Sequence, residues 1–268
     1  MSKIELAVKK LDKNKKMSNY ATKGYWDRAY NVGVYKETFD WLEDWSSLKG
    51  IIEPRIGKQD KILNIGCGNS CLTEDMYDNG YHNIVNMDFS PIVIDQMQSK
   101  NISRHKMVYE VGDCMNMKYQ SQEFDVVIDK GTLDAISCGG KGSYVNMART
   151  LFEVQRVLKP GGICFLISYG EPNSRIFHFQ RDHLCFGIDK FCMNPMQGLN
   201  MVENFVAGWN GNPEKEEDNW CYLLIKKVGA NSKTRDDLIE IEDDIDKEEF
   251  SNKKNNGYNY GESDDDDY

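Results

Sequence analysis

Segments of strand and helix character alternate between residues 61 and 170, and this alternation restricts the folds open to the chain. Short apolar runs typical of buried strands lie at 61–66, 83–88, 106–113, 124–131 and 162–170, with a last one at 220–228. Helical patterns separate them at 70–79, 90–100 and 143–159. Ser90 and Pro91 suit the start of the second helix, and Pro160 and Gly161 follow the third. This order predicts an α/β domain with a mostly parallel sheet and helices on both faces.

The segments outside this alternation differ in composition. Residues 20–50 are rich in aromatic side chains, and apolar positions recur at helical spacing from Thr38, at Phe39, Trp41, Leu42, Trp45 and Leu48. They predict a helix that docks onto the main domain. Residues 1–18 are rich in lysine and predict a flexible N-terminus, and residues 230–268 are acidic and predict a disordered tail. The folded domain is therefore expected over residues 19–229.

The charge and cysteine content exclude several classes of protein. A formal net charge of −10 disfavours binding to nucleic acid phosphates and favours a basic partner. We find no apolar signal segment and no stretch near the ~20 apolar residues of a membrane span, so we expect a cytoplasmic protein with reduced thiols. The spacing of His178, His183, Cys185 and Cys192 matches no zinc pattern, so no metal is expected, and these residues are predicted to line a helix or loop.

Two glycines follow the first predicted strand, in the segment "KILNIGCGNS". Ligands of doubly wound sheets bind at the carboxyl ends of the strands, where Gly66 and Gly68 lie. Glycine lets the backbone bend sharply and approach a ligand closely. The third glycine of a dinucleotide fingerprint is replaced by Cys71, and the Gly-Lys-Ser/Thr ending of a P-loop is absent. A pyrophosphate ligand is therefore disfavoured.

Carboxylates at the ends of the next strands predict a nucleoside at this turn. Asp88 lies about 20 residues after Gly68, where a carboxylate can accept hydrogen bonds from both ribose hydroxyls. Ser90 is expected to cap the following helix, which leaves Asp88 for the ligand. Asp113 ends the third strand, where it can accept from an adenine amino group. A nucleoside without a phosphate site indicates S-adenosylmethionine, with its methionine part over the glycine turn.

The ordered segments resemble a known family. "ILNIGCGNS", "NMDFS", "VGDCMNM", "FDVVIDKGTLDAI" and "VLKPGGICFLISYGEP" resemble the motifs of class I S-adenosylmethionine-dependent methyltransferases. "GCGNS", "DFSPIVI", "DKGTLDA" and "GYWDRAY" are similar to the methyltransferase-like 13 and endothelin-converting-enzyme-associated group, whose members methylate lysines of translation elongation factor 1-alpha. The resemblance covers about residues 20–228. It implies a Rossmann-like, seven-stranded sheet, S-adenosylmethionine as cofactor and a protein substrate such as this basic elongation factor.

The resemblance also implies roles for individual residues. Trp26 and Tyr30 resemble an aromatic lid over the methionine end of the cofactor, and Trp41 stands where the family usually has a tyrosine; plain core packing is the alternative for all three. The remaining cofactor contacts implied are Gly66, Gly68 and Asn69 in the glycine turn, Asp88 at the ribose, Phe89, Asp113 and Cys114 at the adenine, and Asp129 and Lys130 after the fourth strand.

Methyl transfer from a sulfonium is a direct displacement with a neutral leaving group, so alignment and exclusion of water matter most. A lysine substrate, with a reference pKa of about 10.4, must lose a proton before it attacks. Candidates to assist this loss at the open end of the sheet are Asp129, Asp134, Tyr169 and Glu171, of which Asp129 and Tyr169 are chosen. Asp129 and Asp134 have a second interpretation, in which they hold their loops in shape.

Alternatives to a protein-lysine methyltransferase remain open. The segment "DKGT" replaces the polar-Pro-Pro-aromatic turn of amino-methylating DNA and glutamine enzymes, and it contains no Pro-Cys nucleophile for cytosine C5. A class I enzyme acting on a small molecule or another protein side chain fits the same pattern, and residues 171–220 are expected to shape substrate access. A non-catalytic cofactor-binding scaffold is the third alternative, although it has no need of a complete site.

Overall fold

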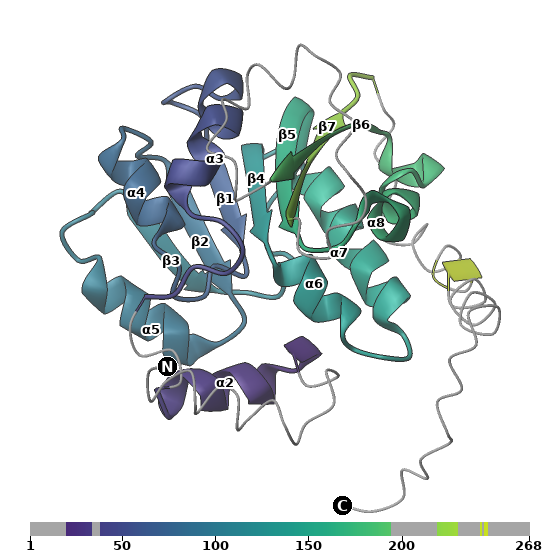
Figure 1. Ribbon diagram of the computed structural model, residues 1–268. Coiled ribbons are helices and arrows are strands. Elements are labelled where there is room, and N and C mark those ends of the chain that lie inside the picture. The colour runs from purple at the N-terminus through teal and green to yellow at the C-terminus, as the bar shows by residue number, and fades with distance from the viewer. Residues whose placement is uncertain (1–19, 34–37, 194–218, 230–241, 243, 246–268) are drawn as a thin grey trace, which may run out of the picture.

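We describe the fold from a computed structural model that covers residues 20–33, 38–193, 219–229, 242, 244 and 245. In this part of the chain, seven strands form one sheet in the order β3-β2-β1-β4-β5-β7-β6 (Figure 1). The strands are β1 (Ile62–Ile65), β2 (Ile84–Asp88), β3 (Met107–Val111), β4 (Phe124–Lys130), β5 (Leu158–Ser168), β6 (Phe186–Met193) and β7 (Asn219–Lys226). The first five pair in parallel, and β7 pairs antiparallel with both β5 and β6. The order reverses between β1 and β4, which places a ligand crevice at that point.

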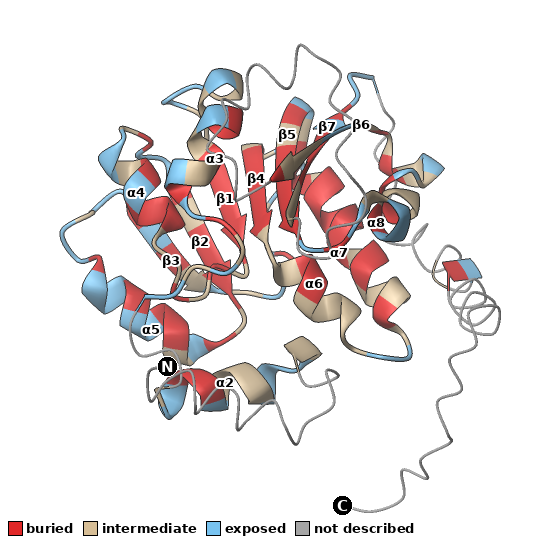
Figure 2. Cartoon of the chain, viewed as in Figure 1, coloured by how far each residue is buried: buried red, intermediate tan, exposed pale blue. Residues whose placement is uncertain are grey.

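Helices cover both faces of the sheet, as the alternation of segments predicts. They are α2 (Lys23–Asn31), α3 (Trp45–Ile52), α4 (Leu72–Asp78), α5 (Pro91–Lys100), α6 (Thr132–Ser137), α7 (Ser143–Val157) and α8 (Pro172–Phe179), with short 3₁₀ turns η2 (Glu53–Arg55) and η3 (Asp182–Leu184). Successive strand residues point to opposite faces: Ile62 and Ile128 pack in the cluster that contains α3, α4 and α5, and Leu63 and Val127 pack in the one that contains α6, α7 and α8. Figure 2 shows the central strands almost entirely buried. This accounts for their continuous apolar sequences.

The helix predicted from Thr38 is shorter than expected. Helix α3 begins only at Trp45, where the carboxylate of Asp44 accepts a hydrogen bond from the Ser47 amide at 3.0 Å. Leu42 has a φ of +66°, which a helix cannot include. Residues 38–44 therefore form an irregular segment, and the prediction of a continuous helix is wrong, because Asp44 is a strong N-cap inside the apolar pattern. Helix α2 lies in the aromatic-rich stretch ahead of it.

Two further boundaries differ from the sequence prediction. Helix α7 ends at Val157 and β5 follows at once from Leu158, so Pro160 and Gly161 lie within the strand, beside a register shift between β4 and β5. Strand β6 was not predicted, because its sequence has no period-2 pattern and lies at the sheet edge.

The histidines and cysteines considered as metal ligands lie in different elements: His178 in α8, His183 in η3 and Cys192 in β6. Among the described residues no group of side chains is arranged to hold a metal ion.

Described residues of the acidic tail contact the rest of the protein. The Arg149 guanidinium on α7 donates two hydrogen bonds to the Glu242 carboxylate, at 2.6 and 2.7 Å. Ile245 is 1% exposed. The remainder of the tail predicted to be disordered lies outside the described residues. The flexible N-terminus predicted for residues 1–18 lies outside the described residues. No helix in the described ranges is long and apolar enough to cross a membrane.

Candidate cofactor pocket and active site

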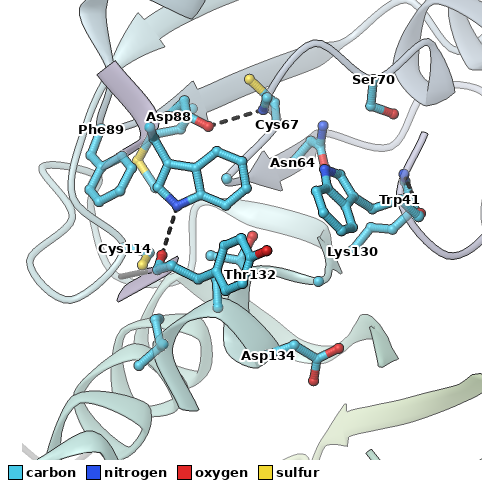
Figure 3. A pocket seen from close by; sticks show the side chains of 18 of the residues that line it. Trp41, Asn64, Cys67, Ser70, Asp88, Phe89, Cys114, Lys130, Thr132 and Asp134 are labelled. Carbon is cyan, nitrogen blue, oxygen red and sulfur yellow. Dashed lines mark hydrogen bonds between the residues drawn. The ribbon is translucent and has the colours of Figure 1, made fainter. Parts of the chain in front are cut away.

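A pocket of about 310 Å³ opens at the carboxyl ends of the parallel strands. Figure 1 shows α2 lying across these ends. The pocket is lined by the glycine turn after β1, by the ends of β2, β3 and β4, by α2, and by Phe39, Trp41 and Leu42. In Figure 3, Asp88, Phe89 and Cys114 lie on one side, and Ser70, Trp41 and Lys130 lie on the other. The site thus occupies the position predicted from the glycine turn.

Both glycines of the turn adopt conformations that few other residues can take. Gly66 has a φ of +56° and Gly68 a φ of +51°. A Cβ on Gly66 would lie 2.0 Å from Oγ1 of Thr132, and one on Gly68 would lie 2.9 Å from the Tyr30 hydroxyl. The Thr132 hydroxyl also donates to the Ile65 carbonyl at 3.0 Å, which holds the start of α6 against the turn. Close packing as well as backbone freedom therefore requires glycine here.

Asp88 is held at the pocket wall by two backbone amides. Its carboxylate accepts from the Gly68 amide at 3.0 Å and from the Ser90 amide at 2.9 Å. Burial raises the pKa of Asp88 to about 6, and the two amide hydrogen bonds oppose this rise. Ser90 occupies the N-cap position of α5, as predicted, but its hydroxyl donates to Asp27 of α2 at 2.6 Å and makes no capping bond to the helix. Ser90 instead links helix α2 to the end of strand β2.

The three predicted aromatic residues all line the pocket. The rings of Trp26 and Tyr30 stack with centroids 5.8 Å apart, and Trp26 meets Trp41 edge-on at 6.2 Å. The Trp26 indole donates to the Tyr20 carbonyl at 2.7 Å, which satisfies its polar atom. Tyr30 is buried, whereas Trp41 is 38% exposed. The cluster therefore covers the pocket and also packs α2 onto the domain.

The end of β3 provides the predicted adenine-side residues. Asp113, Cys114 and Phe89 line the pocket, together with Met115. The Asp113 carboxylate accepts from the Met115 amide at 2.9 Å. The Cys114 thiol lies 3.7 Å from the Thr150 hydroxyl, and burial raises its pKa to about 12. Cys114 is therefore a neutral thiol that offers apolar surface to a planar ligand.

Asp129 is not among the residues that line the pocket. It is 1% exposed, and its carboxylate accepts from the backbone amides of Thr132 at 2.9 Å and Leu133 at 3.2 Å. Burial, with a smaller effect of Asp134, raises its pKa to about 7. This geometry agrees with the second interpretation from the sequence, in which Asp129 holds its loop in shape. It disagrees with the choice of Asp129 as a catalytic and cofactor-binding residue, because the carboxylate is turned toward the first turn of α6.

Tyr169 lies at the pocket, and a buried ion pair holds its backbone. Asp134 accepts from the Tyr169 amide at 3.0 Å, from Nη2 of Arg175 at 3.0 Å and from the Ser168 hydroxyl. Asp134 and Arg175 are both buried, so each compensates the charge of the other. The Tyr169 side chain is 49% exposed, and burial of its other half raises its pKa. Glu171 occupies the N-cap position of α8 and does not line the pocket.

Several residues of the pocket were not predicted from the sequence. Asp40 does not line the pocket itself, but it accepts from Nζ of the lining residue Lys130 at 3.1 Å, a contact between residues 90 positions apart that no local pattern reveals. Asn64 lies within β1 and Thr132 shortly after β4, both inside motifs that were recognised, so the motifs were the available signal. The other lining residues that were missed are Tyr20, Ala21, Phe39, Leu42, Cys67, Ser70, Met87, Gly112, Met115, Gly131, Ala135, Ile136 and Cys138.

The residues present fit S-adenosylmethionine. The turn at Gly66 and Gly68 has no room for a Cβ and lies beside the Asp88 carboxylate. A ribose could therefore approach the backbone of the turn closely while its hydroxyls donate to Asp88. Phe89, Met115 and Cys114 offer apolar surface for an adenine, and Asp113 offers an acceptor for its amino group. Lys130 and the aromatic residues Trp26, Tyr30 and Trp41 would surround the methionine end.

Comparisons with known proteins agree with this fit. Residues 63–166 match the family model described as a methyltransferase domain. The chain resembles the solved Haemonchus contortus phosphoethanolamine N-methyltransferase 1, in complex with S-adenosylhomocysteine, with a TM-score of 0.54 and 14% identity over 88% of this chain and 55% of that one. Together, the sheet order and the family model confirm the predicted class I methyltransferase fold, and they support S-adenosylmethionine as its cofactor.

Several relatives with one kind of name share sequence with this chain. It is 32% identical to mouse EEF1A lysine methyltransferase 4 over 58% of this chain. It is 35% identical to the bovine eEF1A lysine and N-terminal methyltransferase over 63% of this chain. The matches span 64% of the mouse protein and 25% of the bovine protein. The resemblance to this group is thus confirmed at the level of sequence.

Proposed function

We propose that the protein transfers a methyl group from S-adenosylmethionine to a lysine side chain of translation elongation factor 1-alpha or a similar protein. The similarity to proteins named as lysine methyltransferases of this factor carries the proposal. The pocket supports it, because Tyr169 stands half-exposed where a side chain would enter. The net charge of −10 favours a basic protein over nucleic acid. We propose a cytoplasmic location on the same ground, because translation occurs in the cytoplasm.

Under this proposal, some residues of the pocket bind the cofactor and Tyr169 orients the target amine. S-adenosylmethionine, when bound, supplies the electrophilic methyl group. Asp88 would hold the ribose, and the cluster of Trp26, Tyr30 and Trp41 would exclude water from the methionine end. Because the Tyr169 pKa is raised, its phenol stays neutral and would orient the target amine by accepting a hydrogen bond. Asp134 is paired with Arg175, so it is not free to take the proton. The target amine would therefore lose its proton to solvent before it enters the closed end of the pocket.

The test incubates the purified protein with tritiated S-adenosylmethionine and purified elongation factor 1-alpha, and in parallel with a cell extract. We expect label in the elongation factor, and mass spectrometry of its peptides should locate the methyl group on a lysine. An Asp88→Ala variant should lose the label. Asp95→Ala, on the exposed side of α5, is the matched control and should retain it.

The other outcomes identify the alternatives. Label only in small molecules of the extract would indicate a class I enzyme with a metabolite substrate. Methyl groups on another side chain or on the N-terminus would overturn the lysine assignment but keep the protein substrate. Absence of label, with S-adenosylmethionine binding still measurable by calorimetry, would favour a non-catalytic scaffold.

A further inference from the structure

Asp40 joins three segments that surround the methionine end of the pocket. It lies in the irregular segment 38–44, and its carboxylate accepts hydrogen bonds from Nζ of Lys130 at 3.1 Å, from the Cys71 amide at 3.3 Å and from the Ser70 hydroxyl. Ser70 and Lys130 both line the pocket, whereas Asp40 lies behind them. Any effect of Asp40 on a ligand therefore acts through these two neighbours.

Lys130 is a nearly buried cation whose charge needs compensation. Its side chain is 5% exposed, and its ammonium also donates to the Trp41 carbonyl at 2.9 Å. Burial lowers the pKa of Lys130, and the contact with Asp40 is the largest of the effects that oppose this. Asp44 and Glu43 act on the same ammonium from farther along the segment. Asp40 is thus the contacting carboxylate that cancels the positive charge on this wall.

The charge of this wall matters because the two forms of the cofactor differ in charge. S-adenosylmethionine carries a sulfonium cation, and S-adenosylhomocysteine, which remains after methyl transfer, carries a neutral thioether in its place. An uncompensated ammonium on the wall would repel the first and affect the second little. We propose that Asp40 is a positioning residue that holds and neutralises Lys130, and thereby sets the preference of the pocket for the cationic cofactor over the neutral product. This inference rests on the cofactor part of the proposed function and not on the identity of the methyl acceptor.

The test measures the Kd of both ligands by calorimetry in the full-length chain. Asp40→Asn keeps the size of the side chain and an acceptor oxygen but removes the charge. We expect its affinity for S-adenosylmethionine to fall about tenfold and that for S-adenosylhomocysteine by less than about threefold. Ser70→Ala is the matched control, because it removes a hydrogen bond to Asp40 without changing a charge. It should weaken both ligands equally.

Two more variants separate charge from a loosened structure. Lys130→Met leaves the Asp40 charge and should shift the ratio of the two Kd values in the opposite direction, toward S-adenosylmethionine. The double variant Asp40→Asn/Lys130→Met removes both charges and should restore the wild-type ratio. These two variants test the inference even where Asp40→Asn alone does not fold.

The inference is overturned where Asp40→Asn folds with an unchanged ratio, or where Lys130→Met shifts the ratio in the same direction as Asp40→Asn or leaves it unchanged. A wild-type chain that binds neither ligand would overturn the proposed function and this inference together. Wild-type binding with unaltered ratios in the variants overturns the inference alone.

Discussion

The carboxylate of Asp88, at the end of β2, accepts a hydrogen bond from the backbone amide of Gly68 at 3.0 Å. The contact joins the turn after β1 to the end of the neighbouring strand. It holds the carboxylate that would bind the ribose under the proposed function against the backbone of the glycine turn, so the turn and the carboxylate act as one unit. The Ser90 hydroxyl, two residues after Asp88, connects this unit to helix α2 by donating to Asp27.

Replacing Gly66 should lower the stability of the protein more than replacing a glycine that has a positive φ but no close neighbour. In Gly66→Ala, the positive φ and the overlap with Thr132 should together lower the free energy of unfolding by about 3 kcal/mol. Gly140 has a φ of +70° and no described atom within 4 Å of an added Cβ, so Gly140→Ala should cost about 1 kcal/mol. Urea denaturation of both variants measures the difference. Equal losses would contradict the close packing at the turn.

Cofactor affinity should depend on pH through Asp88. Its pKa in the folded protein is raised to about 6, so the carboxylate is ionised at pH 8 and largely protonated at pH 5. A protonated carboxyl is a weaker acceptor for ribose hydroxyls, so the Kd for S-adenosylhomocysteine should rise about tenfold as pH falls from 8 to 5. Calorimetry across this range measures it. Asp88→Asn should bind weakly with little pH dependence, and a wild-type affinity that ignores pH would refute the assignment.

Asp129→Asn should separate a structural role from a catalytic one. The folded-state pKa of Asp129 is raised to about 7, so the folded protein binds this proton more tightly than the unfolded chain. The free energy of unfolding should therefore fall as pH rises from about 4 to about 7. Asn still accepts from the α6 amides but does not titrate, so the variant should show a smaller fall between pH 5 and pH 8 in urea denaturation. Methyl transfer should persist; its loss in a stably folded variant would restore Asp129 as a catalytic residue.

Tyr169→Phe tests the orienting hydroxyl. Removing it should lower kcat about 10- to 100-fold and leave the Kd of S-adenosylhomocysteine unchanged, because the hydroxyl would contact the acceptor amine and not the cofactor. Tyr77→Phe, on α4 beside His82, is the control and should have wild-type kcat. Equal kcat in both variants would remove Tyr169 from the mechanism.

Local sequence patterns predicted most of the fold. They failed where a capping residue interrupts a helical repeat of apolar side chains and where a strand lacks alternation. The parallel strands, three of the helices between them (α4, α5 and α7) and the glycine turn were predicted, because each has its own short-range signal, whereas the short helix α6 was missed. The helix expected from Thr38 failed because Asp44 caps a helix in the middle of an apolar repeat. Strand β6 was missed because an edge strand that pairs only with β7 carries little alternation.

The sequence by itself determined which residues end the strands and therefore which side chains meet at the open edge of the sheet. Asp88, Asp113 and Tyr169 follow from that rule, because parallel strands bring their carboxyl ends together. Only the tertiary structure decided which way each side chain turns. Asp129 faces the α6 backbone because α6 begins three residues later, and Asp40 reaches Lys130 across 90 residues because segment 38–44 folds back over the pocket. Such contacts depend on how distant segments pack, which no local periodicity encodes.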